Sequence, residues 1–126
     1  MKKQIKQVVE FHEKFLQDMQ TKPGLIDLGE ARLRHSLGKE ELDEYLDAAK
    51  KEDLVEIADA LGDQLYILVG TITKHGLQDM IEPIFDLIHE NNMKKLGPDG
   101  KPIFRADCKI IKPKGFEKVE LKTLFP

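Results

Sequence analysis

The stretch Lys39–Tyr66 reads KEELDEYLDAAKKEDLVEIADALGDQLY, and it carries carboxylates at helical spacing on both sides of Lys50-Lys51. Acids three or four residues apart lie on one face of a helix, where like charges repel and weaken the helix by about a few tenths of a kcal/mol per pair. A divalent cation held between two helices would offset that repulsion. The stretch therefore predicts two adjacent helices that share a metal site.

The composition indicates one compact domain over residues 1–126. With 126 residues, of which 40% are apolar and 34% charged, the chain is long enough for one modest core and too short for two. Its formal charge of -3 gives no general attraction to nucleic acid or to an anionic membrane. No segment approaches the roughly 18–20 apolar residues that span a bilayer. Cys108 is the only cysteine, so an internal disulfide is excluded and a reducing, cytoplasmic setting is expected.

Apolar periodicity predicts four helices separated by turn residues. In the first helix, apolar residues recur from Val8 to Met19, and the helix should end near Pro23-Gly24. The third should stop at His75-Gly76, because glycine favours the left-handed conformation that ends helices. Asp79 and Glu82 have the spacing of a capping box for the fourth. The last three helices are expected at about Gly29–Lys51, Glu52–Lys74 and Met80–Leu96. The predicted fold class is all-α, a four-helix-type bundle.

The third helix should be central in this bundle, because it is apolar almost all round. Only a narrow strip of acids interrupts its apolar surface, at Glu56, Asp59 and Asp63. On the second helix, Glu40 and Glu44 share a face, with Glu41 to one side. The apolar stripes are Leu42, Tyr45, Leu46 and Ala49 on the second helix, and Leu54, Ile57, Ala58, Leu61, Leu65, Leu68, Val69 and Ile72 on the third.

Residues from about 97 to 126 change character and predict an extended, basic C-terminal tail. Gly97-Pro98-Asp99-Gly100 is turn chemistry, and lysines and prolines follow it. A basic tail beside an acidic metal site would suit a polyphosphate, whereas the plainer interpretation is a solvated lysine-rich surface. Asn92 and Lys95 continue the core stripe of the fourth helix, where the pattern asks for apolar residues.

The acids point to Mg²⁺ or Mn²⁺, because these cations take oxygen ligands. No histidine lies in a Glu-x-x-His pair, which disfavours zinc and di-iron centres. No glycine-rich phosphate loop of Walker type occurs. Ser36 is the only serine, so a serine-based triad also fails.

The two acidic segments resemble the all-α nucleoside triphosphate pyrophosphohydrolases, the MazG-like and phosphoribosyl-ATP pyrophosphohydrolase-like group. Its signature is EExxE followed, after a dozen or more residues, by ExxD. Here Glu40-Glu41-Leu42-Asp43-Glu44 matches the first part and Glu56-Ile57-Ala58-Asp59 the second, with eleven residues between Glu44 and Glu56. The likeness extends to Phe11-His12, Arg32-Leu33-Arg34, Asp59 to Tyr66, Asn92 to Leu96 and Asp99 to Pro102.

The resemblance implies Mg²⁺-dependent hydrolysis of a nucleoside triphosphate to the monophosphate and pyrophosphate, with Mn²⁺ as an alternative cation. It implies that the cations are held by Glu41, Glu44, Glu56 and Asp59, or by Asp63 in place of Glu56 in the alternative register. Glu40 would accept a proton or hold a further cation, so Glu40, Glu41 and Glu44 are the catalytic residues. The substrate-binding residues would be Tyr66, Asn92, Lys95, Lys109 and Lys112.

The resemblance also implies a homodimer or homotetramer whose pockets include a neighbouring chain. It favours a deoxynucleotide such as dUTP, or a non-canonical nucleotide in a house-cleaning role, over phosphoribosyl-ATP. The competing interpretation is a non-catalytic helical binding or regulatory module with a cation-stabilised acidic cluster.

Overall fold

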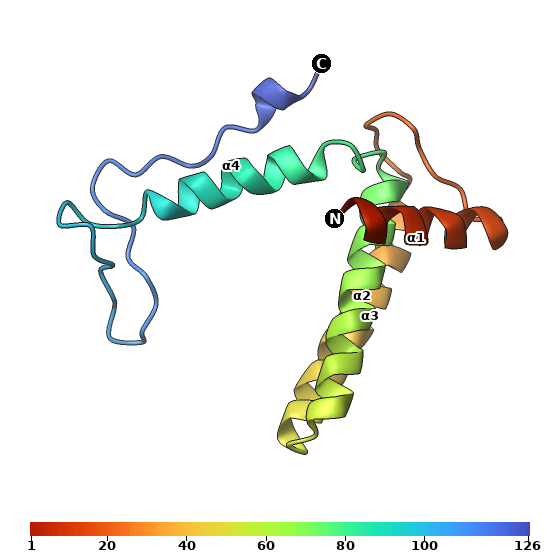
Figure 1. Ribbon diagram of the computed structural model, residues 1–126, viewed down its shortest axis with the longest axis horizontal. Helices are drawn as coiled ribbons and strands as arrows, with labels where there is room; N and C mark the ends of the chain where they lie inside the picture. The colour runs from red at the N-terminus through yellow and green to blue at the C-terminus, as the bar shows by residue number, and fades with distance from the viewer. The chain divides into compact units, whose positions relative to one another are not determined.

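The computed structural model describes residues 1–126 and is all-α, which confirms the predicted fold class (Figure 1). Outside the helices the chain forms no strand, only an isolated antiparallel bridge between Phe104 and Ile110. None of the helices combines the length and the apolar character that a membrane-spanning segment requires. The four α-helices are α1 (Lys2–Lys14), α2 (Leu28–Lys50), α3 (Leu54–Lys74) and α4 (Ile81–Met93), and a short 3₁₀ helix, η1, covers Lys122–Leu124.

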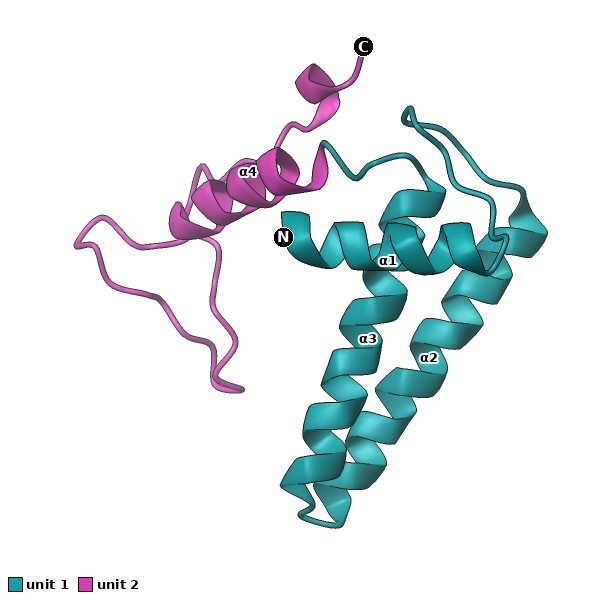
Figure 2. Ribbon diagram, turned by 45° about the vertical axis from the view of Figure 1, so that its right-hand side comes forward, with its two compact units in different colours: residues 1–79 teal, residues 80–126 magenta.

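The chain divides into two compact units, Met1–Asp79 and Met80–Pro126 (Figure 2). The first contains α1, α2 and α3, and the second contains α4 and the segment that follows it. The single domain expected over residues 1–126 stays a prediction.

In the first unit, α2 and α3 form a hairpin, and α1 packs against α3 (Figure 2). Local sequence signals set the starts of the two long helices. The Asp27 carboxylate accepts a hydrogen bond from the Glu30 N–H, and the Asp53 carboxylate accepts bonds from Val55 and Glu56. Such N-caps satisfy backbone donors that have no partner inside the helix. The predicted bounds of α2 and α3 are confirmed to within two residues.

The end of α1 differs from the prediction. The helix ends at Lys14, and Leu16 adopts a positive φ of 54°, although the apolar pattern continues to Met19. The reason is tertiary, because the following segment binds the end of α3. The Gln20 side chain donates to the carbonyls of Lys74 (2.9 Å) and Leu25 (3.1 Å). These bonds take the chain out of its helical path.

The predicted stop at Gly76 is confirmed. Its φ of +67° lies in the left-handed region, which glycine adopts without a steric penalty. A Cβ at this position would collide with the backbone of Lys22. The Gly24 N–H also donates to the His75 carbonyl, so the loop before α2 lies directly against the end of α3.

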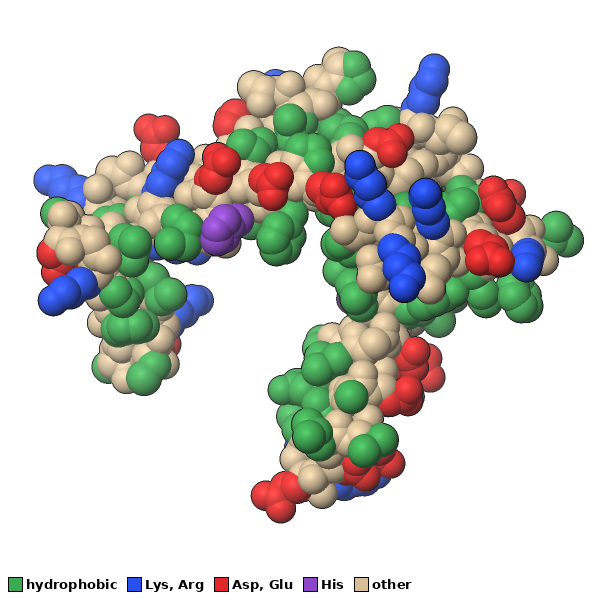
Figure 3. All heavy atoms as spheres, in the orientation of Figure 1, with side chains coloured by type: hydrophobic (Ala, Val, Ile, Leu, Met, Phe, Trp, Pro, Cys, Tyr) green, Lys and Arg blue, Asp and Glu red, His purple; other side chains and the backbone are tan.

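The core of the first unit is small, and most of the predicted apolar stripes lie outside it. Leu42 and Leu46 of α2 are 55% and 51% exposed, and Leu65 and Leu68 of α3 are 44% and 57% exposed. Figure 3 shows these helices with hydrophobic side chains along one edge and acidic side chains along the other. The helices meet through small residues, which leaves the leucine face uncovered within the chain. The buried apolar residues of this unit are Ile5, Val8, Ala48, Ala60, Val69 and Ile72.

In the second unit, the chain after α4 returns along that helix. The Asn91 amide, oriented to satisfy both its groups, donates to the Glu117 carbonyl (3.1 Å) and accepts from the Val119 N–H (3.3 Å). Ile84 is the buried apolar residue of α4, whereas Phe85 is 66% exposed. The predicted capping box is wrong by one position, because Met80 is the N-cap and no side chain caps the helix.

Candidate active site

The acidic residues of α2 and α3 lie along one side of the hairpin. Glu44 of α2 and Asp59 of α3 line the same shallow hollow, of about 310 Å³. Further along the pair, the carboxylate of Asp63 acts electrostatically on that of Glu41. Glu40, Glu44, Glu56, Asp59 and Asp63 are exposed, while Glu41 is half-buried. The two motifs that are separated in the sequence therefore face the same groove.

Glu41 is more buried than the other acids of this groove. Its Oε2 atom is buried and has no hydrogen-bond partner. Burial raises the pKa of the Glu41 carboxyl, and so do the nearby carboxylates of Glu44, Asp63 and Glu40. A buried oxygen without a partner is costly, and either a proton or a cation would satisfy it.

The basic groups near the acids compensate little of their charge. Lys51 approaches Glu56 at 3.8 Å, and both side chains are more than half exposed. Lys39 pairs with Asp43 at 2.8 Å within α2, also in solvent. Exposed pairs of this kind contribute roughly 0–1 kcal/mol. The acids of the groove therefore stay close together without strong internal neutralisation.

The donor set fits a hard cation in its chemistry. Every candidate ligand is a carboxylate oxygen, as Mg²⁺ and Mn²⁺ prefer, and the unpartnered Glu41 oxygen is one of them. Within one chain, however, no three acids or histidines converge closely enough to hold a metal ion. Asp63 interacts with Glu41, whereas Glu56 and Asp59 share the hollow of Glu44. The choice between the Glu56/Asp59 and Asp59/Asp63 ligand pairs therefore stays open.

An aromatic cluster adjoins the acids through Tyr66, which follows Asp63 by one turn of α3. The Phe11 ring meets Tyr66 edge-on at 5.7 Å between centroids and stacks on Phe15 at 4.4 Å. All three side chains are exposed, Phe15 to 63%. Sequence reasoning named Tyr66 but gave Phe15 no role, although the spacing of Phe11 and Phe15 places them on one face of α1.

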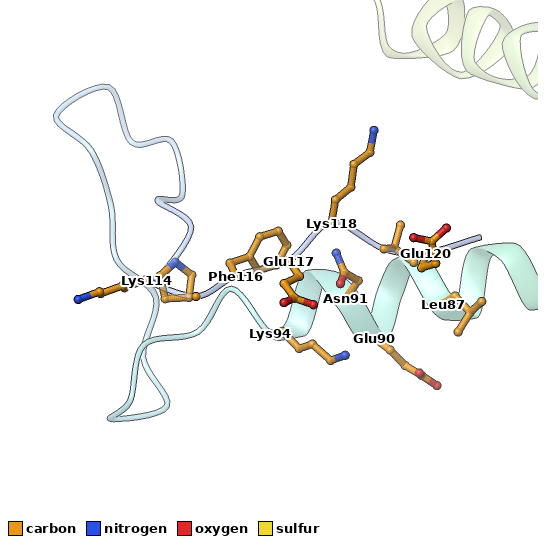
Figure 4. A pocket seen from close by; sticks show the side chains of 12 residues that line it. Leu87, Glu90, Asn91, Lys94, Lys114, Phe116, Glu117, Lys118 and Glu120 are labelled. Atoms are coloured by element: carbon orange, nitrogen blue, oxygen red, sulfur yellow. The ribbon is translucent and has the colours of Figure 1, made fainter. Parts of the chain in front are cut away.

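The other predicted substrate-binding residues belong to the second unit. The ammonium groups of Lys95 and Lys112 lie 5.8 and 5.6 Å from the centre of the Phe116 ring. Asn92 and Lys109 are exposed, Asn92 on α4 and Lys109 in the turn after Asp107. A nearby hollow of about 450 Å³ between α4 and the returning chain has a mixed charge (Figure 4). Its charged lining residues are Glu90, Lys94, Lys114, Glu117, Lys118 and Glu120.

A buried polar cluster joins the three helices of the first unit, and sequence reasoning did not find it. His12 and Lys74 are only 4% and 6% exposed, and Lys74 pairs with Glu30 at 2.9 Å. The Thr73 hydroxyl donates to the Gly70 carbonyl at 2.8 Å, so it accepts from His12 Nδ1, at 3.4 Å. Arg34 completes the cluster from α2.

The neutral state of His12 should make the stability of the fold depend on pH. Burial lowers the pKa of His12 below its ordinary value of 6.5, and the charges of Lys74 and Arg34 lower it further, against a smaller opposing effect of Glu30. The unfolded chain therefore binds a proton before the folded one does, so stability is present above pH 6.5 and is lost as the pH falls below it. We expect the melting temperature of the parent protein to decrease as the pH is lowered from 7.5 to 5.5.

His12→Gln should flatten this dependence in thermal melts across that range. His89→Gln, a change at an exposed histidine of α4, is the control and should keep the slope of the parent. A parent curve without slope in this window would contradict a buried neutral imidazole.

The all-α fold and the carboxylate-lined groove between α2 and α3 agree with the class that sequence comparison gives, the hydrolases that act on acid anhydrides. The particular family follows from a comparison of sequences: the model of phosphoribosyl-ATP pyrophosphohydrolase matches residues 8–92. The chain belongs to this family, which is part of the all-α MazG-like nucleoside triphosphate pyrophosphohydrolase superfamily. It is a pyrophosphohydrolase, and its family depends on divalent cations. No curated protein matches the chain.

Proposed function

We propose that this protein is a Mg²⁺-dependent nucleoside triphosphate pyrophosphohydrolase that releases a nucleoside monophosphate and pyrophosphate. The observation that carries the proposal is the unpartnered, buried Oε2 of Glu41 among the carboxylates of Glu44, Asp63 and Glu40. The negative charges of these carboxylates repel one another, and a cation-bound substrate in the groove would remove that repulsion. Pyrophosphate release from a panel of nucleotides with Mg²⁺ or Mn²⁺ tests it.

The residues of the groove would divide the chemistry among them. A bound divalent cation would neutralise phosphate charge and lower the pKa of a coordinated water. Glu41 and Glu44 would hold it from α2, together with Asp59 and either Glu56 or Asp63 from α3. Glu40, which is exposed at the edge of the same cluster, would accept the proton of the attacking water.

The aromatic and basic residues would bind the rest of the nucleotide. The exposed rings of Tyr66, Phe11 and Phe15 offer an apolar aromatic surface one turn from Asp63, which suits a base or sugar. In the second unit, Lys95, Lys112 and Lys109 would bind phosphate oxygens. Asn92 at the end of α4 would bond the sugar or base.

For the substrate, we propose dUTP or a non-canonical nucleotide, which implies a house-cleaning role. This choice follows the branch that the quoted motifs resemble, whereas the family description names phosphoribosyl-ATP. Side-by-side values of kcat/KM for dUTP, the common nucleoside triphosphates, damaged-base analogues and phosphoribosyl-ATP decide between them. A kcat/KM for phosphoribosyl-ATP above that of every triphosphate would refute the proposed specificity.

Divalent cations should stabilise the protein in the absence of nucleotide. A ligand that binds only the folded state raises stability by mass action, by about 2.7 kcal/mol at 100 times its Kd. We therefore expect Mg²⁺ or Mn²⁺ to raise the melting temperature of the parent and to raise that of Glu44→Gln much less. Ca²⁺-free melts over a range of Mg²⁺ concentrations measure this. Equal shifts in both proteins would count against a shared metal site.

We further propose that two copies of the chain pair through the leucine face of α2 and α3. This face is formed by Leu42, Leu46, Leu65 and Leu68, which are each about half exposed, and it includes an apolar groove of about 750 Å³. Contiguous apolar surface of this kind marks interaction sites in soluble proteins. A second copy would bury the stripes that sequence analysis placed in a core. That a neighbouring chain also contributes to the acidic site follows from the family resemblance and not from this face, because the leucines and the acids lie along opposite edges of the hairpin.

The competing function is a non-catalytic binding or regulatory module. The acids would then serve only cation-dependent folding, and the apolar face would hold a partner protein. The nucleotide panel discriminates the two, because a module of this kind releases no pyrophosphate from any substrate while its melting temperature still rises with Mg²⁺.

A further inference from the structure

The Arg34 side chain links α2 to α3 through two hydrogen bonds. Its Nη2 donates to the carbonyl of Ile67 at 2.6 Å, and its Nε donates to the hydroxyl of Thr71 at 3.0 Å. The Thr71 hydroxyl in turn donates to the same Ile67 carbonyl at 3.1 Å. A carbonyl inside a helix ordinarily accepts only the backbone N–H four residues later. Here two side chains also converge on it.

The structure makes room for this link. A Cβ on Gly70 would stand 2.5 Å from Arg34 Nη2 and 3.4 Å from His12 Nε2, so the absence of a side chain at Gly70 lets the guanidinium reach α3. No carboxylate pairs with Arg34 at salt-bridge distance, because the nearby Glu30 is bound to Lys74. Arg34 therefore directs its planar donors at neutral acceptors of α3, a geometry that lysine cannot reproduce.

The position of this link relates it to the acids. Arg34 precedes Glu41 by seven residues, which is two turns on the same face of α2. Ile67 follows Asp63 by four residues, one turn of α3. The bonds of Arg34 consequently restrict both sliding and rotation of α2 against α3. They act within two turns of the point at which Glu41 faces Asp63.

Near the acids, few other side-chain contacts join α2 to α3, although the short connection Lys51–Asp53 also ties the two helices together. The buried residues at the acidic level are Ala48 and Ala60, which have little shape to interlock. The Gln64 side chain donates to the Glu41 carbonyl, but at 3.5 Å. The Glu30–Lys74 pair lies further from the acids, toward the end of α3.

We propose that Arg34 is a positioning residue, which sets the register of α2 against α3 and thereby holds Glu41 and Glu44 opposite the acids of α3. The inference rests on the proposed metal-binding function. It predicts that loss of the Arg34 link weakens cation binding in protein that is still folded.

The test is a Mn²⁺ titration of nucleotide-free protein, in which electron paramagnetic resonance measures the free Mn²⁺. The titration is done at a temperature at which circular dichroism shows each variant to be folded. Arg34→Lys keeps the charge and loses the planar donors, and Thr71→Val removes one acceptor with little change of shape. Both should weaken Mn²⁺ affinity by about 10-fold or more, as loss of groups that orient metal ligands does.

Two controls separate positioning from general destabilisation. Thr71→Ser keeps the hydroxyl and should bind Mn²⁺ within about twofold of the parent. So should Val69→Ala, which weakens the core at a residue that lies beside α1. If Arg34→Lys does not fold, Thr71→Val against Thr71→Ser carries the comparison.

The outcomes are distinct. Parent-like affinity in Thr71→Val, or an equal loss in Val69→Ala, would overturn the role of Arg34 and leave the proposed function intact. A parent that bound no Mn²⁺ would overturn the proposed metal site, and the positioning role with it.

Discussion

Glu44→Gln should reduce pyrophosphate release by more than about 100-fold, because loss even of a group that only orients a metal ligand costs roughly 10–100-fold. Glu44 lies between the two parts of the groove: it acts on the carboxyl of Glu41 and lines the hollow with Asp59. The substitution keeps the shape of the side chain and removes a charge that would hold the cation. Steady-state release of pyrophosphate at saturating Mg²⁺ measures the effect.

The same variant should keep its fold, and without metal it should be no less stable than the parent, because it relieves carboxylate repulsion. The matched control is Asp43→Asn, since Asp43 is the neighbouring acid of α2 and pairs with Lys39. It should retain activity within about twofold. Unfolding of Glu44→Gln would show that this acid is structural and that its assignment is wrong.

Leu68→Glu should dissociate the proposed dimer and lower activity with it. Leu68 is 57% exposed in the isolated chain and lines the apolar groove between α2 and α3. Burying an unpaired carboxylate in an apolar interface costs several kcal/mol. Light scattering after gel filtration should report a mass near that of one chain, 14.4 kDa, in place of twice that value.

Leu25→Glu is the control for that experiment, because Leu25 is 92% exposed in the loop before α2 and lies outside the leucine face. It should leave mass and activity unchanged. A parent that is already monomeric and fully active would refute both the dimer and the idea that a second copy completes the groove.

The boundaries of α2 and α3 could be predicted because their signals are local. Asp53 caps α3 with its own side chain, and Gly76 ends it through a backbone conformation that other residues adopt at a cost. The end of α1 could not be predicted in the same way. Its apolar pattern runs on to Met19, but the bonds of Gln20 to the end of α3 outweigh that pattern.

That acids line one side of α2 and α3 was also predicted from their spacing, while their individual environments were not. Periodicity placed Glu41 to one side of the Glu40/Glu44 face, and the structure places it against α3 with a buried oxygen. Arg34 attracted attention only as part of a resemblance. Its partners, Thr71 and the Ile67 carbonyl, are more than thirty residues away, and a backbone carbonyl leaves no mark in a sequence.

By itself the sequence determined the helical class, the approximate bounds of the two long helices and the placement of acids on helical faces, because each depends on residues within a few turns of one another. Only the tertiary structure decided which acid is buried, which basic side chains lie between the helices, and that the leucine face is left uncovered. Those properties depend on the register and rotation of one helix against another, and many remote contacts set them together.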